Sequence, residues 1–297
     1  MNKYLIFRTD RIGDFLLTAI LINSIKRNEP NSIITVVSSE KNYNYIKSFN
    51  FVDEVILLKN NFFDKIMLIK KLRKTYYEFV ILHDSKNRSS IISSFLKFGL
   101  KIKPNSNSNI SYIEIIKKIL SELNFNFIDL DLNTLKKRIY NSLDCSNRDF
   151  ILFHFDEKWI YSDYISEYTN IEPSKDALIS FINLLLITSN KELIITTGMN
   201  CPNILNDILN NNLDSRIKIY KKLEFLDLEN LISKCKLLVS CHGSVSHVAA
   251  AHQIKQIDII EEKKLNFYSK WNAHFRNYTP IYRKKFSELT KEIIQLL

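Results

Sequence analysis

Short runs of β-branched residues alternate with helix-like segments along most of this chain of 297 residues. The first half has predicted strands at 3–9, 33–38, 54–58 and 78–83, and predicted helices from residue 12 and at 62–75, 88–98 and 110–123. The second half has predicted strands at 150–155, 192–197, 216–220, 236–240 and 256–260, and predicted helices at 175–187, 224–233, from 245, and at 286–297. Strands separated by helices of this length predict βαβ units and parallel sheets.

The length of the chain and one strand-poor stretch predict two domains. A chain of 297 residues is about twice the size of a usual domain of roughly 150 residues. Residues 129–149 lack a clear strand and include three consecutive cations at 136–138, so we place the domain crossing there. The predicted domains are residues 1–145 and 146–280, two α/β halves that face each other across a cleft. Residues 281–297 are predicted to form a C-terminal helix that packs back toward the first domain.

The charge balance favours anionic partners. Lys and Arg number 42 and Asp and Glu 32, which gives a net charge of +10. Such a surplus suits nucleic acid, phosphorylated sugars or an acidic membrane face. We expect no nucleic-acid partner, because no recognised nucleic-acid module is present and the charge is spread along the chain. The basic helix at 62–75 has two interpretations: a surface that lies on an anionic membrane, or an apolar stripe facing the core with a solvated charged side.

Cysteine usage and hydropathy predict a cytoplasmic location, with peripheral attachment to the inner face of the membrane as an option. Cys145, Cys201, Cys235 and Cys241 form no CxxC pair and no disulfide-like framework, as expected in a reducing compartment. Charged residues interrupt the apolar run at the N-terminus too early for a signal peptide. Nowhere do about 18 apolar residues run uncharged, so no membrane-spanning helix is predicted.

The turn after the first predicted strand carries a candidate catalytic carboxylate. The strand ends near Thr9, and Gly13 and Asp14 open the following helix. There Asp14 lies beside unpaired backbone N–H groups, at an edge of the sheet where ligands of open parallel sheets bind. An ionised carboxylate in this position can remove a proton from a sugar hydroxyl. Two alternatives stay open: Asp14 stabilises the helix and nothing more, or Asp10 is the functional carboxylate of this turn.

The motifs of two common nucleotide-binding classes are missing from this first turn. Gly13 stands alone, so the segment fits neither GxGxxG nor the phosphate loop GxxxxGK[ST]. The sequence therefore argues against a nicotinamide-dependent dehydrogenase and against a P-loop ATPase.

Two turns of the second half are candidate anion sites. Lys158 follows the strand at 150–155, where a lysine can meet a diphosphate or remain a solvated surface cation. In LLVSCHGSVSHVAAAH, residues 237–252, a strand passes through a turn of small and polar residues into a helix, and the free N–H groups of a helix start bind anions. Thr197 and Gly198, which end another predicted strand, are expected to line a nucleotide pocket. His242 is either a cation that assists a diphosphate or a neutral hydrogen-bonded turn residue.

Metal ligation is not predicted. His247 and His252 are five residues apart, which turns them about 140° around a helix and away from the i, i+4 spacing of helical metal ligands. Asp129 and Asp131 form an Asp-x-Asp pair, but they lie in the predicted domain crossing.

Several segments resemble the heptosyltransferases of glycosyltransferase family 9. The opening of that family is similar to residues 7–37, FRTDRIGDFLLTAILINSIKRNEPNSIITVV, with Gly13, Asp14 and Pro30 at matching places. The likeness continues through residues 78–98, where Arg88 and Ser89 match. The second family signature, Asp-Thr-Gly-x-x-His-x-x-Ala-Ala, is similar to residues 242–251. There His242, Gly243 and Ser244 depart from it, and His247 and the alanines are retained.

The resemblance implies a GT-B fold of two Rossmann-like domains and an inverting, metal-independent glycosyltransferase. Such an enzyme moves a heptose-like sugar from an ADP-linked donor to a lipopolysaccharide-core or related anionic, lipid-linked glycan, with no cofactor besides the substrate nucleotide. The implied general base is Asp14, and the implied phosphate contact is Lys158. The implied donor-binding residues are Thr197, Gly198, His242, Gly243, Ser244, Ser246 and His247. The implied acceptor-binding residues are Arg11, Gly13 and Arg88. The departures at 242–244 leave open a non-catalytic protein that binds a sugar nucleotide or glycan.

Overall fold

The computed structural model of the chain describes residues 1–104, 110–135, 149–161, 167–209 and 214–297. The chain divides into two compact units, Met1–Lys136 and Lys137–Leu297. The predicted boundary at 145/146, the cations at 136–138 and Cys145 lie outside the described residues.

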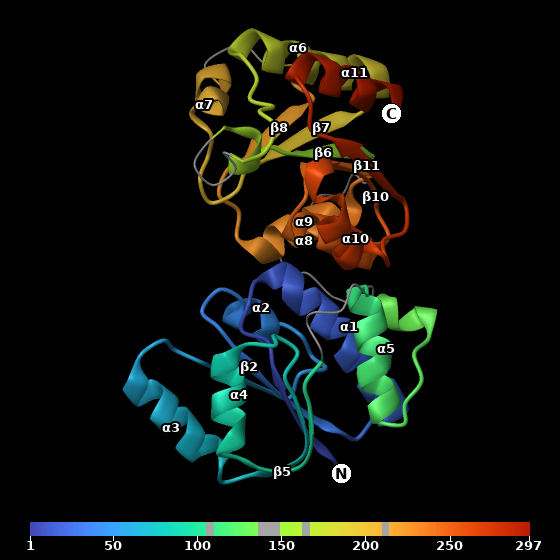
Figure 1. The fold of residues 1–297 in the computed structure, drawn as a ribbon. Coiled ribbons are helices and arrows are strands. Elements are labelled where there is room, and N and C mark those ends of the chain that lie inside the picture. The colour runs from blue at the N-terminus through green and yellow to red at the C-terminus, as the bar shows by residue number, and fades with distance from the viewer. Residues whose placement is uncertain (105–109, 136–148, 162–166, 210–213) are drawn as a thin grey trace. The chain divides into compact units, whose positions relative to one another are not determined.

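The first unit contains a five-stranded sheet in which all strands are parallel (Figure 1). Its order is β3-β2-β1-β4-β5, so the first strand is central and the chain adds strands on one side of it and then on the other. The strands are β1 (Lys3–Phe7), β2 (Ile33–Ser38), β3 (Glu54–Leu57), β4 (Tyr76–Ile81) and β5 (Lys97–Ile102). The reversal between β1 and β4 is a topological switch point, where ligands of such sheets bind.

Helices cover both faces of the first sheet. On one side α1 (Ile12–Asn28) packs against α5 (Tyr112–Glu122) and the short 3₁₀ segment η1 (Asp129–Leu132). On the other side the leucines of α3 (Phe62–Leu72) and Ile92 of α4 (Asn87–Ser94) join Leu5, Phe7 and Val80 in one apolar core. The short helix α2 (Tyr43–Lys47) lies next to β3. Residues 3–7 and 33–38 are buried almost throughout, which matches the continuous apolar runs of a sheet covered on both faces.

The edge strand β5 corrects a prediction. Residues 88–98 were expected to be helical, but α4 ends at Ser94 and residues 97–102 form a strand beside β4. Its sequence, KFGLKI, is exposed at three of its six residues, and lysine or glycine alternates with an apolar residue. Gly99 permits the close pairing, because a Cβ there would lie 3.0 Å from the carbonyl oxygen of Glu78. Pairing with β4, rather than local propensity, determines this strand.

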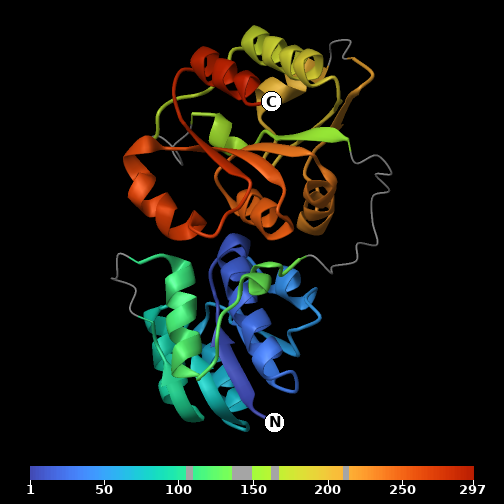
Figure 2. The same cartoon turned by 90° about the vertical axis from the view of Figure 1, so that its right-hand side faces the viewer.

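The second unit contains a six-stranded parallel sheet with the same layout (Figure 2). Its order is β11-β10-β9-β6-β7-β8, and the strand order reverses between β6 and β9. The strands are β6 (Phe150–His154), β7 (Glu192–Thr196), β8 (Ile217–Tyr220), β9 (Leu237–Cys241), β10 (Lys255–Ile260) and β11 (Tyr278–Tyr282). The edge strand β11 falls in a segment for which the sequence analysis predicted no strand.

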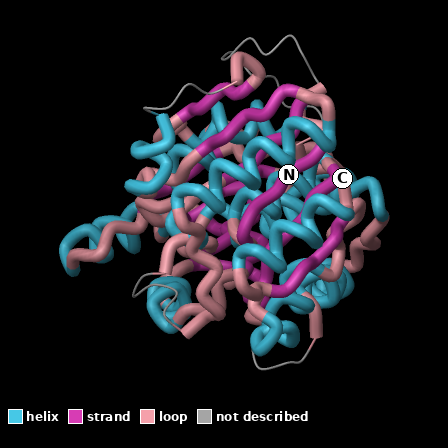
Figure 3. Tube along the Cα trace, turned by 90° about the horizontal axis from the view of Figure 1, so that it is seen from above, coloured by secondary structure: helices cyan, strands magenta, loops and turns pink. Residues whose placement is uncertain are grey.

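The helices of the second unit again form two layers. Figure 3 distinguishes the helices from the strands of the chain by colour. One layer contains α6 (Lys175–Ser189), α7 (Asn203–Leu209) and α11 (Phe286–Gln295), with η2 (Glu157–Trp159) at its edge. The other contains α8 (Phe225–Lys234), α9 (Ser244–His252) and α10 (Leu265–Asn272), with η3 (Glu262–Lys264). Figures 1 and 2 both show α6 and α11 side by side.

The C-terminal helix packs in the second unit. Residues 281–297 were expected to pack back toward the first domain. Instead Phe286, Leu289 and Ile293 of α11 are buried with Phe181 of α6 and Trp159 in the core of the second unit. This helix is strongly amphipathic, and one apolar stripe can be buried on one surface at a time.

Within the described residues, no helix is long and apolar enough to cross a membrane. Cys201, Cys235 and Cys241 are free thiols, and the latter two are buried.

Candidate functional site

Two polar clusters lie at the carboxyl ends of the central strands, one in each unit. In the first unit the cluster follows β1 and β4, and in the second it follows β6 and β9. These are the switch points of the two sheets. The cluster after β1 and β4 is called the β1 cluster below, and the cluster after β6 and β9 the β6 cluster.

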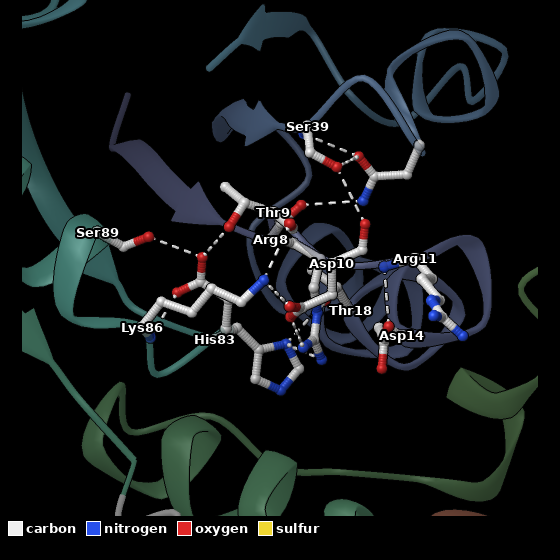
Figure 4. A network of polar contacts seen from close by, with 12 residues as sticks. Arg8, Thr9, Asp10, Arg11, Asp14, Thr18, Ser39, His83, Lys86 and Ser89 are labelled. Atoms are coloured by element: carbon white, nitrogen blue, oxygen red, sulfur yellow. Dashed lines mark hydrogen bonds and ion pairs between the residues drawn. The ribbon is translucent and has the colours of Figure 1, made fainter. Parts of the chain in front are cut away.

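A buried arginine anchors the β1 cluster (Figure 4). The Arg8 side chain is buried, and its Nε donates a hydrogen bond of 2.7 Å to Oγ1 of Thr18 on α1. Its Nη1 donates to Asp10 at 3.2 Å. Thr18 in turn lies 2.8 Å from Nδ1 of the buried His83, which follows β4. Burial, together with the positive charge of Arg8, lowers the pKa of His83 well below its ordinary value, so this ring is a neutral acceptor.

The structure separates the two carboxylates of the first turn. Both oxygens of Asp10 are engaged by cations, Oδ2 by Arg8 and Oδ1 by Lys86. Asp14 instead accepts a hydrogen bond of 2.8 Å from the backbone N–H of Arg11, at the start of α1. Asp14 is half-buried, and it lines a pocket described below. Asp14 thus differs from Asp10 in that the backbone, rather than a pair of cations, engages it.

Arg88 ties the start of α4 to the end of β1. Its Nη2 donates to Oγ1 of Thr9 at 2.8 Å and to the Thr9 carbonyl at 3.1 Å, and its Nη1 donates to Asn60 at 3.3 Å. Thr9 and Ser89 both donate to Asp84, at 2.6 and 2.7 Å. Ser89, which the family resemblance singled out, is therefore part of the network that holds this turn. Arg8, His83, Asp84 and Lys86 belong to the cluster but were not predicted as site residues.

An open pocket of about 660 Å³ adjoins the β1 cluster, and every residue that lines it belongs to the first unit. Its lining residues are Thr9, Asp10, Arg11, Asp14, Ser39, Glu40, Lys41, Leu58, Asn60, Lys86 and Arg88. Four of these side chains are cationic and three are acidic. Arg11 and Arg88, which the family resemblance assigned to acceptor binding, both line this pocket. Gly13 is buried in the first turn of α1 and is not among the lining residues.

An ion pair lies at the centre of the β6 cluster. Lys158 pairs with Asp156, whose second oxygen accepts from the Lys158 backbone N–H at 3.1 Å. Burial alone would raise the pKa of Asp156, but the Lys158 ammonium and His154 outweigh burial and hold that pKa below its ordinary value. Burial would lower the pKa of Lys158, but the Asp156 carboxylate holds it above its ordinary value. Lys158 is therefore a cation whose charge is balanced by the Asp156 carboxylate.

The Lys158 ammonium reaches the turn after β9. A Cβ built at Gly243 would lie 2.9 Å from Nζ of Lys158, so the glycine leaves the space that this side chain occupies. Arg283 stabilises the turn after β6, because its Nη2 donates to the Lys158 carbonyl at 2.9 Å. The turns after β6 and β9, predicted separately as anion sites, are thus one place next to the start of α9.

A carboxylate from the neighbouring strand β10 organises the altered signature. Asp258 is fully buried, and it accepts from Nδ1 of His242 at 2.6 Å and from Oγ of Ser246 at 2.7 Å. Ser246 also accepts from the Gly243 backbone N–H at 3.2 Å. His242 is therefore hydrogen-bonded within the turn, and the choice between its two predicted roles stays a prediction. The departure from the family's Asp at position 242 was visible in the sequence, but Asp258 was not predicted as a site residue. The one acidic residue in the apolar run QIDII was the signal for it.

The other predicted donor-binding residues have varied surroundings. The Thr197 hydroxyl bonds its own chain, since it donates to the Gly198 carbonyl at 2.9 Å and accepts from the Lys222 N–H at 3.1 Å. Ser244 is half-exposed at the start of α9. His247 is buried against the ring of Phe275, with 5.1 Å between centroids. The aromatic segment 267–278 thus packs around α9. In the part of the chain that the structure describes, no cluster of His, Cys, Asp and Glu could hold a metal ion.

Two parallel α/β units, each with its first strand at the centre of the sheet, form a two-domain Rossmann-like fold of the GT-B type, as predicted. Heptosyltransferase WaaC of E. coli, solved with ADP, has a TM-score of 0.75 to this chain at 13% sequence identity. The match covers 99% of this chain and 98% of WaaC.

A glycosyl transferase of family 9 from Veillonella parvula has a TM-score of 0.68 at 13% identity, over 98% of this chain and 89% of that one. ADP-heptose lps heptosyltransferase II of E. coli has a TM-score of 0.66 at 14% identity, over 100% of this chain and 98% of that one. No family model matches the sequence. No curated protein matches it either. The structural likeness thus confirms the resemblance to heptosyltransferases at the level of the fold.

Proposed function

We propose that the chain is a glycosyltransferase that moves a heptose-like sugar from an ADP-linked donor to an anionic or lipid-linked glycan of the lipopolysaccharide-core type. The observation that carries the proposal is the contact of the Lys158 ammonium with Gly243 at the start of α9. It puts a cation and the N-terminus of a helix at one place, which suits a diphosphate. The fold is shared with a heptosyltransferase that was solved with ADP, which supports this choice of donor.

In this proposal the β6 cluster binds the donor and stabilises its leaving group. The departing diphosphate gains negative charge as the bond to the sugar breaks. Donors that already point at the developing charge lower the barrier, often by several kcal/mol. Lys158 and the first turn of α9 would supply this stabilisation in place of a metal ion. Asp156 keeps Lys158 charged and holds it close to Gly243, while Asp258 holds His242 and Ser246 around the same turn.

The pocket of the first unit would bind the acceptor, with Asp14 as the general base. Asp14 takes the proton of the acceptor hydroxyl, whose oxygen attacks the anomeric carbon from the side opposite the diphosphate. One bond to the sugar forms as the other breaks, so the configuration inverts and no covalent intermediate with the enzyme arises. The four cations of the pocket lining suit an acceptor with phosphate or carboxylate groups. Such an acceptor and a nucleotide sugar would place the reaction at the inner face of the cytoplasmic membrane.

The replacement Asp14→Asn tests the proposed base. The amide can still accept from the Arg11 N–H, so we expect normal folding and an unchanged thermal shift with ADP. Turnover with a lipopolysaccharide-core extract should fall by about 10²–10⁴-fold, because a positioned base typically contributes that factor. Asp64→Asn is the matched control, since Asp64 occupies the same first-turn position of α3 and likewise bonds at its helix start. Turnover of Asp14→Asn close to that of the parent would refute the assignment.

One observation favours a second function, a non-catalytic protein that binds a sugar nucleotide or glycan. The Asp14 carboxylate already has a role in the fold, since it accepts from the backbone at the start of α1. Such a protein would show a thermal shift with ADP but neither hydrolysis of the donor nor transfer of its sugar. Measuring both reactions with the purified chain separates the two functions.

A further inference from the structure

The first two turns of α3 expose three large apolar side chains. Phe62 is 70% exposed, Phe63 80% and Met67 62%. The core needs a different side of this helix, where Leu68 and Leu72 are buried. One of the two predicted interpretations of this segment was an apolar stripe that faces the core. That interpretation accounts for the two leucines, but it does not explain the exposed phenylalanines and methionine.

Cations surround these side chains. Spacings of three and four residues separate Phe63, Met67, Lys70 and Lys74. The first three therefore share one face of α3, and Lys74 follows just after the helix ends. Lys59 precedes the helix, and its side chain is 54% exposed. The acidic residue in the first turn, Asp64, lies 3.9 Å from Lys59 and bonds Asn61. The residues Lys59, Phe62, Phe63, Met67, Lys70 and Lys74 are called the α3 surface below.

We propose that the α3 surface binds the chain to an anionic lipid membrane. Two exposed aromatic rings and a flexible methionine can enter the boundary between headgroups and acyl chains, while lysines remain at the anionic headgroups. Neither contribution is enough alone, since stable attachment normally takes an apolar and an electrostatic signal together. A protein partner would need charged groups placed opposite each lysine, whereas an anionic bilayer supplies negative charge wherever the lysines lie. The three exposed lysines therefore favour lipid.

The α3 surface lies close in the sequence to the pocket of the first unit, so membrane binding would affect what reaches that pocket. Asn60 lines the pocket and accepts from Arg88, and Phe62 follows it by two residues. A membrane at the α3 surface would thus lie near the pocket of the same unit. This consequence rests on the proposed function, in which that pocket takes a lipid-linked glycan. The membrane binding itself does not.

The test is co-sedimentation of the full chain with vesicles of phosphatidylcholine, with and without phosphatidylglycerol. We expect binding to the anionic vesicles that weakens with salt. Phe62→Ser/Phe63→Ser should weaken it at least about tenfold, because the apolar area of the two rings no longer leaves water. Lys70→Gln/Lys74→Gln should weaken it about 25-fold, since each cation near an anionic surface contributes about 1 kcal/mol. The matched control is Leu184→Ser/Ile187→Ser, which removes two exposed apolar residues of α6 and should leave binding unchanged.

Several outcomes would overturn the proposal. They are absence of binding to the anionic vesicles, equal binding to both kinds of vesicle, and variants that bind as the parent does. Light scattering without lipid tests whether the α3 surface instead binds a second copy of the chain. If the parent self-associates and Phe62→Ser/Phe63→Ser abolishes this, the surface joins two copies of the chain. The vesicles contain neither donor nor acceptor, so these results do not depend on glycosyl transfer. An unchanged melting temperature and circular dichroism spectrum would show that the variants are folded.

Discussion

Asp258 shows how much one buried side chain determines in the second unit. Its two oxygens accept from His242 and from Ser246, and Ser246 accepts from the backbone of Gly243. A fully buried carboxylate is costly unless its oxygens are bonded, and here both are. The turn that replaces the family signature thus has a carboxylate after all, supplied by β10 rather than by the turn itself.

The replacement Asp258→Asn should destabilise the protein. The amide has one oxygen, so one of the two donors loses its acceptor, which costs about 1–3 kcal/mol when the group left behind is buried. Urea unfolding measures this as a lower midpoint. Asp214→Asn serves as the control, because Asp214 is exposed and pairs with its neighbour Arg216, and its midpoint should stay at the parent value. Equal midpoints for both variants would show that Asp258 does not hold the turn.

Residue types could be predicted at the site better than their partners. Asp14 and Lys158 were selected from the turns that follow predicted strands, and both lie in polar clusters. Asp156, two residues before Lys158, was missed, because its role comes from burial beside the ammonium. Asp10 and Asp14 could not be told apart in the sequence. The cations of Arg8 and Lys86 distinguish them, and Lys86 arrives from the loop after β4.

At the scale of elements, all the central strands and the edge strands β3 and β8 were predicted, whereas the edge strands β5 and β11 were not. Residues 33–38 were predicted as a strand with the observed bounds of β2, since an apolar β-branched run is typical of a strand covered on both faces. The edge strands β5 and β11 have mixed sequences, KFGLKI and YTPIY, and each has one neighbour. These two strands form because they pair with β4 and β10, and local periodicity in the sequence does not reveal such pairing.

The helix α11 gives a prediction at this scale. Leu289 is fully buried in the core shared with α6, so Leu289→Ala should lower the free energy of unfolding by about 2–5 kcal/mol. Ile187→Ala on α6 is the control, because that side chain is 73% exposed and its loss should change stability by less than about 0.5 kcal/mol. Both are measured by chemical denaturation. A small effect of Leu289→Ala would mean that α11 does not belong to this core.

At the scale of the whole molecule, each unit has its own sheet and its own buried core. We therefore expect Met1–Lys136 and Lys137–Leu297 to fold as separate fragments, each with a cooperative urea transition followed by circular dichroism. Under the proposed function, ADP should raise the melting temperature of the second fragment and leave that of the first unchanged. A fragment that stays unfolded would contradict independent folding. An ADP shift confined to the first fragment would contradict the assignment of the donor site.

The sequence by itself determined the alternation of strands and helices, the division into two α/β halves and the turns that carry polar residues. These are local properties: periodicity, β-branched runs and the residues at helix starts are properties of neighbours in the chain. The tertiary structure decided which of those turns meet. Lys158 and Gly243 are 85 residues apart, and His242 follows β9 whereas Asp258 lies on β10. They come together because β6 pairs with β9 and β9 with β10. Strand pairing joins residues that are far apart in the chain, and it is determined by the burial of both faces of the whole sheet.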